Sequence, residues 1–176
     1  MIIGLTGYAG SGKSTAADVL VACGWERRKF ATPLKNMLRS LLYDQGTDYD
    51  TVNRMIEGDL KEVESAMLGG KTPRYAMQTL GTEWGRMRLS DSLWVDAALR
   101  NLGDRTVFDD VRFNNEARAI RSRGGLIIRV VRPGVGRASD HMSEQLVSPD
   151  LNLINDGSLA DLCERLSSAD FPICAV

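Results

Sequence analysis

Eight consecutive residues near the start of the chain have the types and the spacing of a phosphate-binding loop. Gly7-Tyr8-Ala9-Gly10-Ser11-Gly12-Lys13-Ser14 matches the pattern G-x-x-x-x-G-K-[ST] in full. Glycine lets backbone N–H groups turn toward phosphate oxygens, and the positive end of a following helix strengthens the attraction. A plain glycine turn is the alternative, but it needs neither the lysine nor the serine. We therefore expect the phosphates of a nucleoside triphosphate to be bound by Gly7, Ala9, Gly10, Ser11, Gly12, Lys13, Ser14 and Thr15.

The chemistry of this loop calls for a cation and a metal. Lys13 offers an ammonium group to the β- and γ-phosphates, and Ser14 offers a hydroxyl to Mg²⁺. A carboxylate is expected at the end of a neighbouring strand, and residues 107–110 end an apolar run with two acids. Ser14 and Asp110 are therefore the candidate metal ligands. Asp109 is an open alternative to Asp110, and a solvated strand end is the alternative for either acid.

The elements that must position these groups alternate between strand and helix. Short apolar runs predict strands at residues 1–6, 25–30, 106–109, 126–131 and 151–154. Helical spacing predicts helices at residues 14–23, after Pro33, after Pro73, at 92–102 and 114–123, and from a cap at Ser158. In the helix after Pro73, Met77, Leu80, Trp84 and Met87 share one face. This alternation predicts an α/β fold with a parallel sheet.

Length and charge narrow the class of protein. The 176 residues fit one domain, and 22 basic against 23 acidic residues leave a net charge of −1. Neither a basic nucleic-acid binder nor a membrane-surface protein fits that balance. Three scattered cysteines indicate reduced thiols, and no apolar run is long enough to span a bilayer. With no basic segment before the first apolar run, we expect no signal peptide and a cytoplasmic protein.

Phosphate-binding loops occur in kinases, GTPases and motor ATPases. A GTPase needs a base-reading segment of the N-K-x-D type, and Asn155-Asp156 lacks the intervening lysine. Motor ATPases usually need longer chains. A glycine- and arginine-bearing segment at about 133–149 predicts a lid, so a small-molecule kinase fits better.

An ordered set of segments resembles the deoxynucleoside monophosphate kinases of bacteriophage type. It is spread over nearly the whole chain and comprises residues 4–15, 30–35, 74–83, 110–113, 130–134, 141–144 and 154–159. The loop alone is shared by many families, whereas the ordered set is more specific. Phosphomevalonate kinases are similar in the loop, in Pro33-Leu34-Lys35 and in Asp110-Val111-Arg112.

The resemblance implies a three-layer P-loop fold with a five-stranded parallel sheet. It also implies a single kinase domain over 1–176, with an acceptor-binding helical insert at about 31–104 and a lid at about 133–149. The implied reaction transfers the γ-phosphoryl group of ATP, with Mg²⁺, to a deoxynucleoside monophosphate (dNMP) and yields the diphosphate. Neither nucleic acid nor membrane is an expected partner, and the sequence is compatible with a homodimer. A phage enzyme of this kind would work in the host cytoplasm.

The resemblance also nominates residues for the reaction. Catalytic cations would be Lys13, Arg112, Arg132 and Arg137, and the acceptor would be bound by Lys35, Arg74, Gln78, Asp110 and Arg112. Arg74 and Gln78 share a helix face, so both can look into one pocket, with the guanidinium on the acceptor phosphate and the amide on the base. Solvated surface positions are the alternatives for these side chains. His141 is expected on the surface, Trp94 in the core, and Asn155 either beside adenine or in a turn.

Two other functions remain open. One is a P-loop kinase for another phosphorylated acceptor, of the dephospho-coenzyme A or phosphomevalonate type, which a substrate panel distinguishes. The other is a nucleotide-binding regulator without turnover, which would bind ATP but release no ADP when an acceptor is added. Binding alone would not need Lys13, Ser14, Asp110 and Arg112 together, so the kinase is favoured.

Overall fold

The computed structural model describes residues 1–136 and 147–168, which include parts of two compact units. Residues 1–30 and 99–176 form what we call the core unit, and residues 31–98 form the inserted unit. The acceptor-binding insert is expected at about 31–104, and the inserted unit comprises residues 31–98. In the described part of the chain, no helix is long and apolar enough to cross a membrane.

A five-stranded parallel sheet forms the centre of the core unit, as predicted. Its order is β2 (Glu26–Arg28), β3 (Thr106–Phe108), β1 (Ile2–Thr6), β4 (Leu126–Val131) and β5 (Leu151–Ile154), and every neighbouring pair is parallel. All five residues of β1 are buried, because a central parallel strand is covered on both faces. β1 is thus the central strand of the sheet, and the glycine loop begins directly after its last residue, Thr6.

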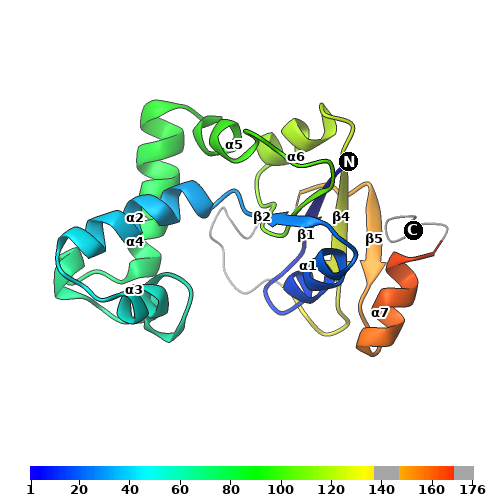
Figure 1. Cartoon of the computed structure of the whole chain (residues 1–176), viewed down its shortest axis with the longest axis horizontal. Coiled ribbons are helices and arrows are strands. Elements are labelled where there is room, and N and C mark those ends of the chain that lie inside the picture. Colours follow the sequence, from blue (N-terminus) through cyan, green and yellow to red (C-terminus); the bar gives the residue numbers. More distant parts are fainter. Residues whose placement is uncertain (137–146, 169–176) are drawn as a thin grey trace. The chain divides into compact units, whose positions relative to one another are not determined.

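Helices cover both faces of this sheet. Ile3 and Leu5 point to the face covered by α1 (Lys13–Ala22) and α7 (Leu159–Leu166), which Figure 1 shows with the strands. Gly4 points to the opposite face, where an added Cβ would lie 2.7 Å from Ile120 of α6 (Asn114–Arg121). The predicted three-layer arrangement is thus present. Gly24, with a φ of +84°, follows the end of α1, and Ser158 caps α7 with Asp161 as expected.

The inserted unit is helical and has its own core. It comprises α2 (Thr32–Asp44), α3 (Tyr49–Ile56), two short 3₁₀ turns η1 (Asp59–Glu62) and η2 (Ala66–Leu68), α4 (Pro73–Thr79), the π-helix η3 (Leu80–Leu89) and α5 (Leu93–Ala98). Side chains of α2 and α3 form the core: Leu38, Leu42, Val52, Met55 and Ile56. Asp48 caps α3 and Thr72 caps α4 by accepting backbone N–H groups.

Two predicted helices differ from the structure. The helix predicted at 92–102 ends at residue 98. Asn101 has a φ of +52°, which a right-handed helix cannot accommodate, and the carbonyls of Arg100 and Asn101 accept hydrogen bonds from Arg28. The helix after Pro73 changes at residue 80 to the wider π form, in which the N–H of Ser90 donates to the oxygen of Gly85. The α-helical spacing that placed four apolar residues on one face therefore does not hold beyond α4.

Candidate functional site

The glycine loop joins β1 to α1 and has the backbone that its sequence predicts. Gly7, Gly10 and Gly12 have φ values of +142°, +79° and +98°, which side chains other than hydrogen resist. A Cβ at Gly7 would also lie 2.5 Å from the carbonyl oxygen of Val130. Positive φ at all three positions favours glycine there, and the pattern specifies it at Gly7 and Gly12.

Lys13 lies over this loop. Its ammonium group donates to the carbonyl oxygens of Gly7 and Tyr8, each at 2.8 Å. Ser14 and Thr15 follow in the first turn of α1 and are exposed, whereas the hydroxyl of Ser11 is buried without a hydrogen-bond partner among the described residues. The loop therefore presents one cation, exposed hydroxyls and the N-terminal end of a helix, the combination that binds phosphate.

Asn155, at the end of β5, contacts the same loop. Its side-chain amide donates to the carbonyl oxygen of Ser11 at 2.8 Å, and a Cβ at Gly12 would lie only 2.1 Å from that nitrogen. Sequence reasoning placed Asn155 beside adenine or in a turn and missed this contact. No local signal could show it, because 144 positions separate the two partners.

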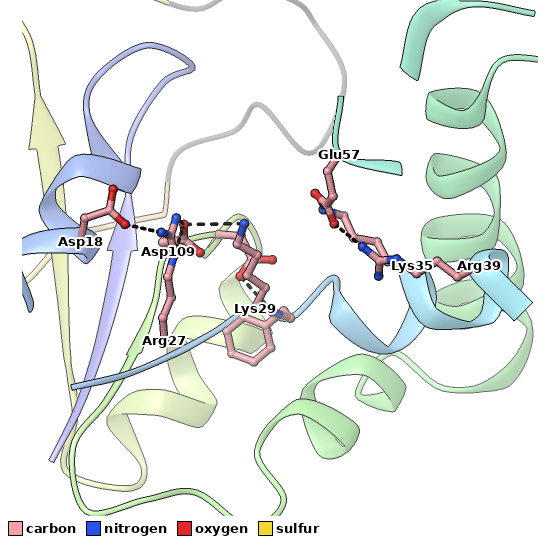
Figure 2. A network of polar contacts seen from close by, with 9 residues as sticks. Asp18, Arg27, Lys29, Lys35, Arg39, Glu57 and Asp109 are labelled. Carbon is pink, nitrogen blue, oxygen red and sulfur yellow. Dashed lines mark hydrogen bonds and ion pairs between the residues drawn. The ribbon is translucent and has the colours of Figure 1, made fainter. Parts of the chain in front are cut away.

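Asp109, directly after β3, is buried and paired with a cation. Its Oδ2 accepts a bond of 3.0 Å from the Nε of Arg27 and a second from the same guanidinium, and Lys29 approaches to 4.0 Å (Figure 2). Arg27 also pairs with Asp18 at 2.6 Å. Burial would lower the pKa of Arg27, but the hydrogen bond and charge of Asp109 raise it above its ordinary value. Sequence reasoning did not single out Arg27.

The other carboxylate oxygen of Asp109 is a candidate acceptor for water bound to a metal ion. Oδ1 is buried and has no hydrogen-bond partner among the described residues, so it is available to accept from metal-bound water. Those residues include no group of three or more His, Cys, Asp or Glu side chains arranged for a metal. Mg²⁺ is commonly held by one or two protein ligands together with substrate phosphates. Ser14 and Asp109 fit that mode.

Asp110 has a different environment. Its Oδ1 accepts the backbone N–H of Phe30 at 2.9 Å. The next candidate, Arg112, is exposed, and its own N–H and that of Phe113 donate to the buried carboxylate of Glu116. Arg112 and Arg132, which follows β4, are therefore exposed cations of the core unit. Arg137 and His141 lie outside the described residues.

The expected acceptor-binding residues lie on helices of the inserted unit. Lys35 on α2 pairs with Glu57 at 2.6 Å, and Arg39 shares this carboxylate at 2.8 Å (Figure 2). Arg74 on α4 pairs with Glu62. Gln78 lies on the same helix and is half-buried. The structure thus gives both basic candidates carboxylate partners.

The inserted unit also contains a pocket of about 810 Å³ that sequence reasoning did not identify. The residues that line it come from α2, η2, α4 and η3: Met37, Leu38, Leu41, Leu68, Ala76, Thr79, Leu80, Glu83, Trp84 and Arg88. None of the predicted acceptor-binding residues lines this pocket. Trp94, in contrast, is buried as expected.

Comparisons with known proteins bear on the family to which this chain belongs. A model of the deoxynucleotide monophosphate kinase family matches residues 43–166, a range that excludes the loop. A protein of Acanthamoeba polyphaga mimivirus, whose name assigns it provisionally to these kinases, is 32% identical, with 96% of this chain and 95% of that protein covered. The deoxynucleotide monophosphate kinase of Enterobacteria phage T4 is 28% identical, with 78% of this chain and 59% of that enzyme covered.

Among solved structures, TT1252 from Thermus thermophilus is 21% identical, with a TM-score of 0.49 and coverage of 98% of this chain and 96% of that one. The family match and the similarity to the mimivirus protein extend over most of the chain. They confirm the resemblance found in the sequence and the expectation of a kinase. The chain is an enzyme that belongs to the deoxynucleotide monophosphate kinase family.

Proposed function

We propose that the protein transfers the γ-phosphoryl group of ATP to a deoxynucleoside monophosphate, giving ADP and the deoxynucleoside diphosphate, in the host cytoplasm. The observation that carries this proposal is the loop of residues 7–14, in which Lys13 lies against the carbonyls of Gly7 and Tyr8. Such a loop binds triphosphate, and the family relatives are named for the acceptor.

Phosphoryl transfer depends on positioning and charge neutralisation more than on covalent chemistry. When triphosphate enters the loop, Lys13 exchanges its two carbonyl partners for phosphate oxygens. Mg²⁺, when bound, neutralises phosphate charge, and Ser14 with Asp109 would hold it. Arg112, Arg132 and Arg137 are the proposed cations for the charge that spreads over the transferring group.

The proposed acceptor contacts are Lys35 and Arg74 for phosphate and Gln78 for the base edge. Lys35 shares Glu57 with Arg39, so an incoming phosphate can draw Lys35 away while the carboxylate keeps one partner. Arg74 is exposed, and its ion pair with Glu62 is exposed on both sides. Exposed pairs contribute about 0–1 kcal/mol, so exchange for a phosphate costs little.

Replacement of Lys13 tests the proposal. Lys13→Met is expected to lower kcat/KM for ATP-dependent phosphorylation of dNMPs by about 100-fold or more, because a charge aimed at the transferring phosphates is lost. Lys71→Met is the matched control, since Lys71 is exposed and lies over the ring of Tyr75. The measurement is ADP release across the four dNMPs, the four NMPs and dephospho-coenzyme A, with thermal unfolding to verify the fold.

Other outcomes would contradict the assignment. Unchanged dNMP phosphorylation by Lys13→Met would remove the proposed role of the loop. Turnover with dephospho-coenzyme A but with no dNMP would indicate a kinase for another acceptor. ATP binding without acceptor-dependent ADP release would indicate a regulator.

A further inference from the structure

We propose that Asp110 is a positioning residue that anchors the point at which the chain leaves the core unit. The anchored residue is Phe30, the last residue of the core unit before the inserted unit begins at Ala31. The expected effects on activity rest on the proposed function, whereas the hydrogen bond between Asp110 and Phe30 can be measured without turnover.

Two contacts hold Phe30. Its N–H donates to the Oδ1 of Asp110 at 2.9 Å, and its ring stacks on Phe108, with centroids 4.5 Å apart and planes 19° from parallel. Phe30 as a whole is 2% exposed. Strand β2 ends at Arg28, opposite Phe108, so Phe30 lies beyond the ladder of the sheet. A carboxylate from the chain that follows β3 thus takes the place of a strand partner.

The anchor lies close in sequence to the expected acceptor contacts. Helix α2 begins at Thr32, so only Ala31 separates it from the fixed backbone of Phe30. Lys35 lies in the first turns of this helix, and its N–H donates to the carbonyl oxygen of Ala31 at 3.0 Å. Loss of the anchor therefore frees the segment from which the helix carrying Lys35 starts.

The returning chain is anchored in a similar way. Arg28 donates to the carbonyl oxygens of Arg100 and Asn101 at 2.9 and 2.7 Å. The Oε1 of Glu26 accepts a hydrogen bond from the Nε of Arg28 at 2.7 Å, and the Oε2 of Glu26 accepts the N–H of Gly103 at 3.2 Å. Charged side chains of the core unit thus bind the backbone at both crossings.

The two neighbouring acids consequently have different roles. Asp109 faces Arg27 and has a buried oxygen without a partner among the described residues, as a metal-water acceptor needs. Asp110 accepts a backbone amide. An amide oxygen can replace a carboxylate in accepting N–H, but it cannot supply negative charge near a metal. Substitution by asparagine therefore separates the two roles.

Three variants test the assignment: Asp110→Ala, Asp110→Asn and Asp109→Asn. NMR hydrogen exchange of the Phe30 amide is measured on each full-length protein, together with kcat, KM for the dNMP and dependence on Mg²⁺. Asp110→Ala is expected to speed exchange of this amide about 10-fold and to raise KM for the dNMP about 10-fold, because a charged hydrogen bond is lost. Asp110→Asn is expected to restore most of both properties relative to Asp110→Ala, because its accepting oxygen remains.

Asp109→Asn is the matched variant for the metal. It should raise the Mg²⁺ concentration needed for half-maximal rate while leaving Phe30 exchange as in the parent. The proposal is overturned if Asp110→Ala leaves Phe30 exchange unchanged. It is also overturned if Asp110→Asn is as inactive as Asp110→Ala and shifts the Mg²⁺ requirement, which would make Asp110 a metal ligand. If the parent protein phosphorylated no dNMP, the proposed function would be refuted. Hydrogen exchange of the Phe30 amide needs no turnover, so it would still decide whether Asp110 anchors Phe30.

Discussion

The charged side chains of the candidate site are held by opposite charges close by. Arg27 contacts Asp109, Lys35 contacts Glu57, and Arg74 contacts Glu62. A net charge of −1 is therefore compatible with the proposed cationic contacts, since each of these three cations has a carboxylate partner. Each pair keeps its cation oriented, because charge-assisted hydrogen bonds are directional.

Asp150 shows how one carboxylate connects three segments of the core unit. Its Oδ2 accepts the N–H of Ile127 on β4 at 2.7 Å, and its Oδ1 accepts the Nε of Arg121 on α6 at 3.0 Å. Burial would raise the pKa of Asp150, but the bonds from Arg121 and Ile127 lower it below its ordinary value. A lowered pKa in the folded state makes the ionised carboxylate stabilising above the unfolded pKa, and this contribution is lost as the pH falls through the folded value.

We expect Asp150→Ala to lower the free energy of unfolding by about 1–2 kcal/mol at pH 7, allowing for partial exposure. The difference from the parent should narrow once the pH falls below about 4, near the ordinary pKa of aspartate. Urea unfolding between pH 7 and pH 3 measures it, with Asp150→Asn, which retains one acceptor, giving an intermediate loss. A difference that is constant over this range would contradict the assigned cause.

At the scale of elements, the π-helix η3 is matched to one buried tryptophan on α5. The indole Nε1 of Trp94 donates to the carbonyl oxygen of Gly81 at 2.8 Å, and the side chain is 3% exposed. A Cβ at Gly85 would lie 2.4 to 2.5 Å from three atoms of the indole. Gly85 therefore leaves space that Trp94 fills, whereas Gly81 offers the indole a carbonyl oxygen.

Gly85→Ala is therefore expected to destabilise the protein by about 1–3 kcal/mol, because the indole must move from its place. Gly81→Ala is the matched control on the same helix, since its Cβ would meet only the end of the Leu34 side chain at 3.3 Å. The measurements are urea unfolding and the near-ultraviolet circular dichroism of tryptophan. Equal losses from the two variants would show that helix glycine itself, rather than contact with Trp94, decides stability.

At the scale of the whole molecule, each of the two units has a hydrophobic core of its own. Leu42 is fully buried in the core of the inserted unit, and Ile128 is fully buried in the core between the sheet, α1 and α7. The chain enters the inserted unit once and leaves it once. Units with independent cores can open separately, with different free energies.

We expect Leu42→Ala, which costs about 2–5 kcal/mol at a buried leucine, to speed amide exchange in residues 31–98 while β1 and β4 keep their protection. Ile128→Ala is the reciprocal control and should speed exchange first in the sheet. Hydrogen exchange followed by mass spectrometry measures both patterns. If either variant sped exchange equally throughout the chain, the two units would open as one.

Much of the fold followed from local patterns in the sequence. The order of strands and helices, the parallel sheet and the caps at Gly24 and Ser158 were predicted, because apolar periodicity and capping residues act over a few positions. The change to a π-helix at residue 80 was not predicted, and neither was the contact of Trp94 with Gly81 and Gly85, because it joins residues of different elements. The roles of Arg27 and Asn155 were missed for the same reason.

The sequence by itself determined the phosphate-binding loop, because Gly7, Gly12 and Lys13, which the pattern specifies, act through backbone conformation and charge within eight residues. It also determined the family, through segments spread along the chain. Only the tertiary structure showed that Asp109 and Asp110 have different hydrogen-bond partners, because a local pattern cannot separate two adjacent acids after one strand. Their difference comes from Arg27 and Phe30, which β2 and the chain that follows it bring to the end of β3.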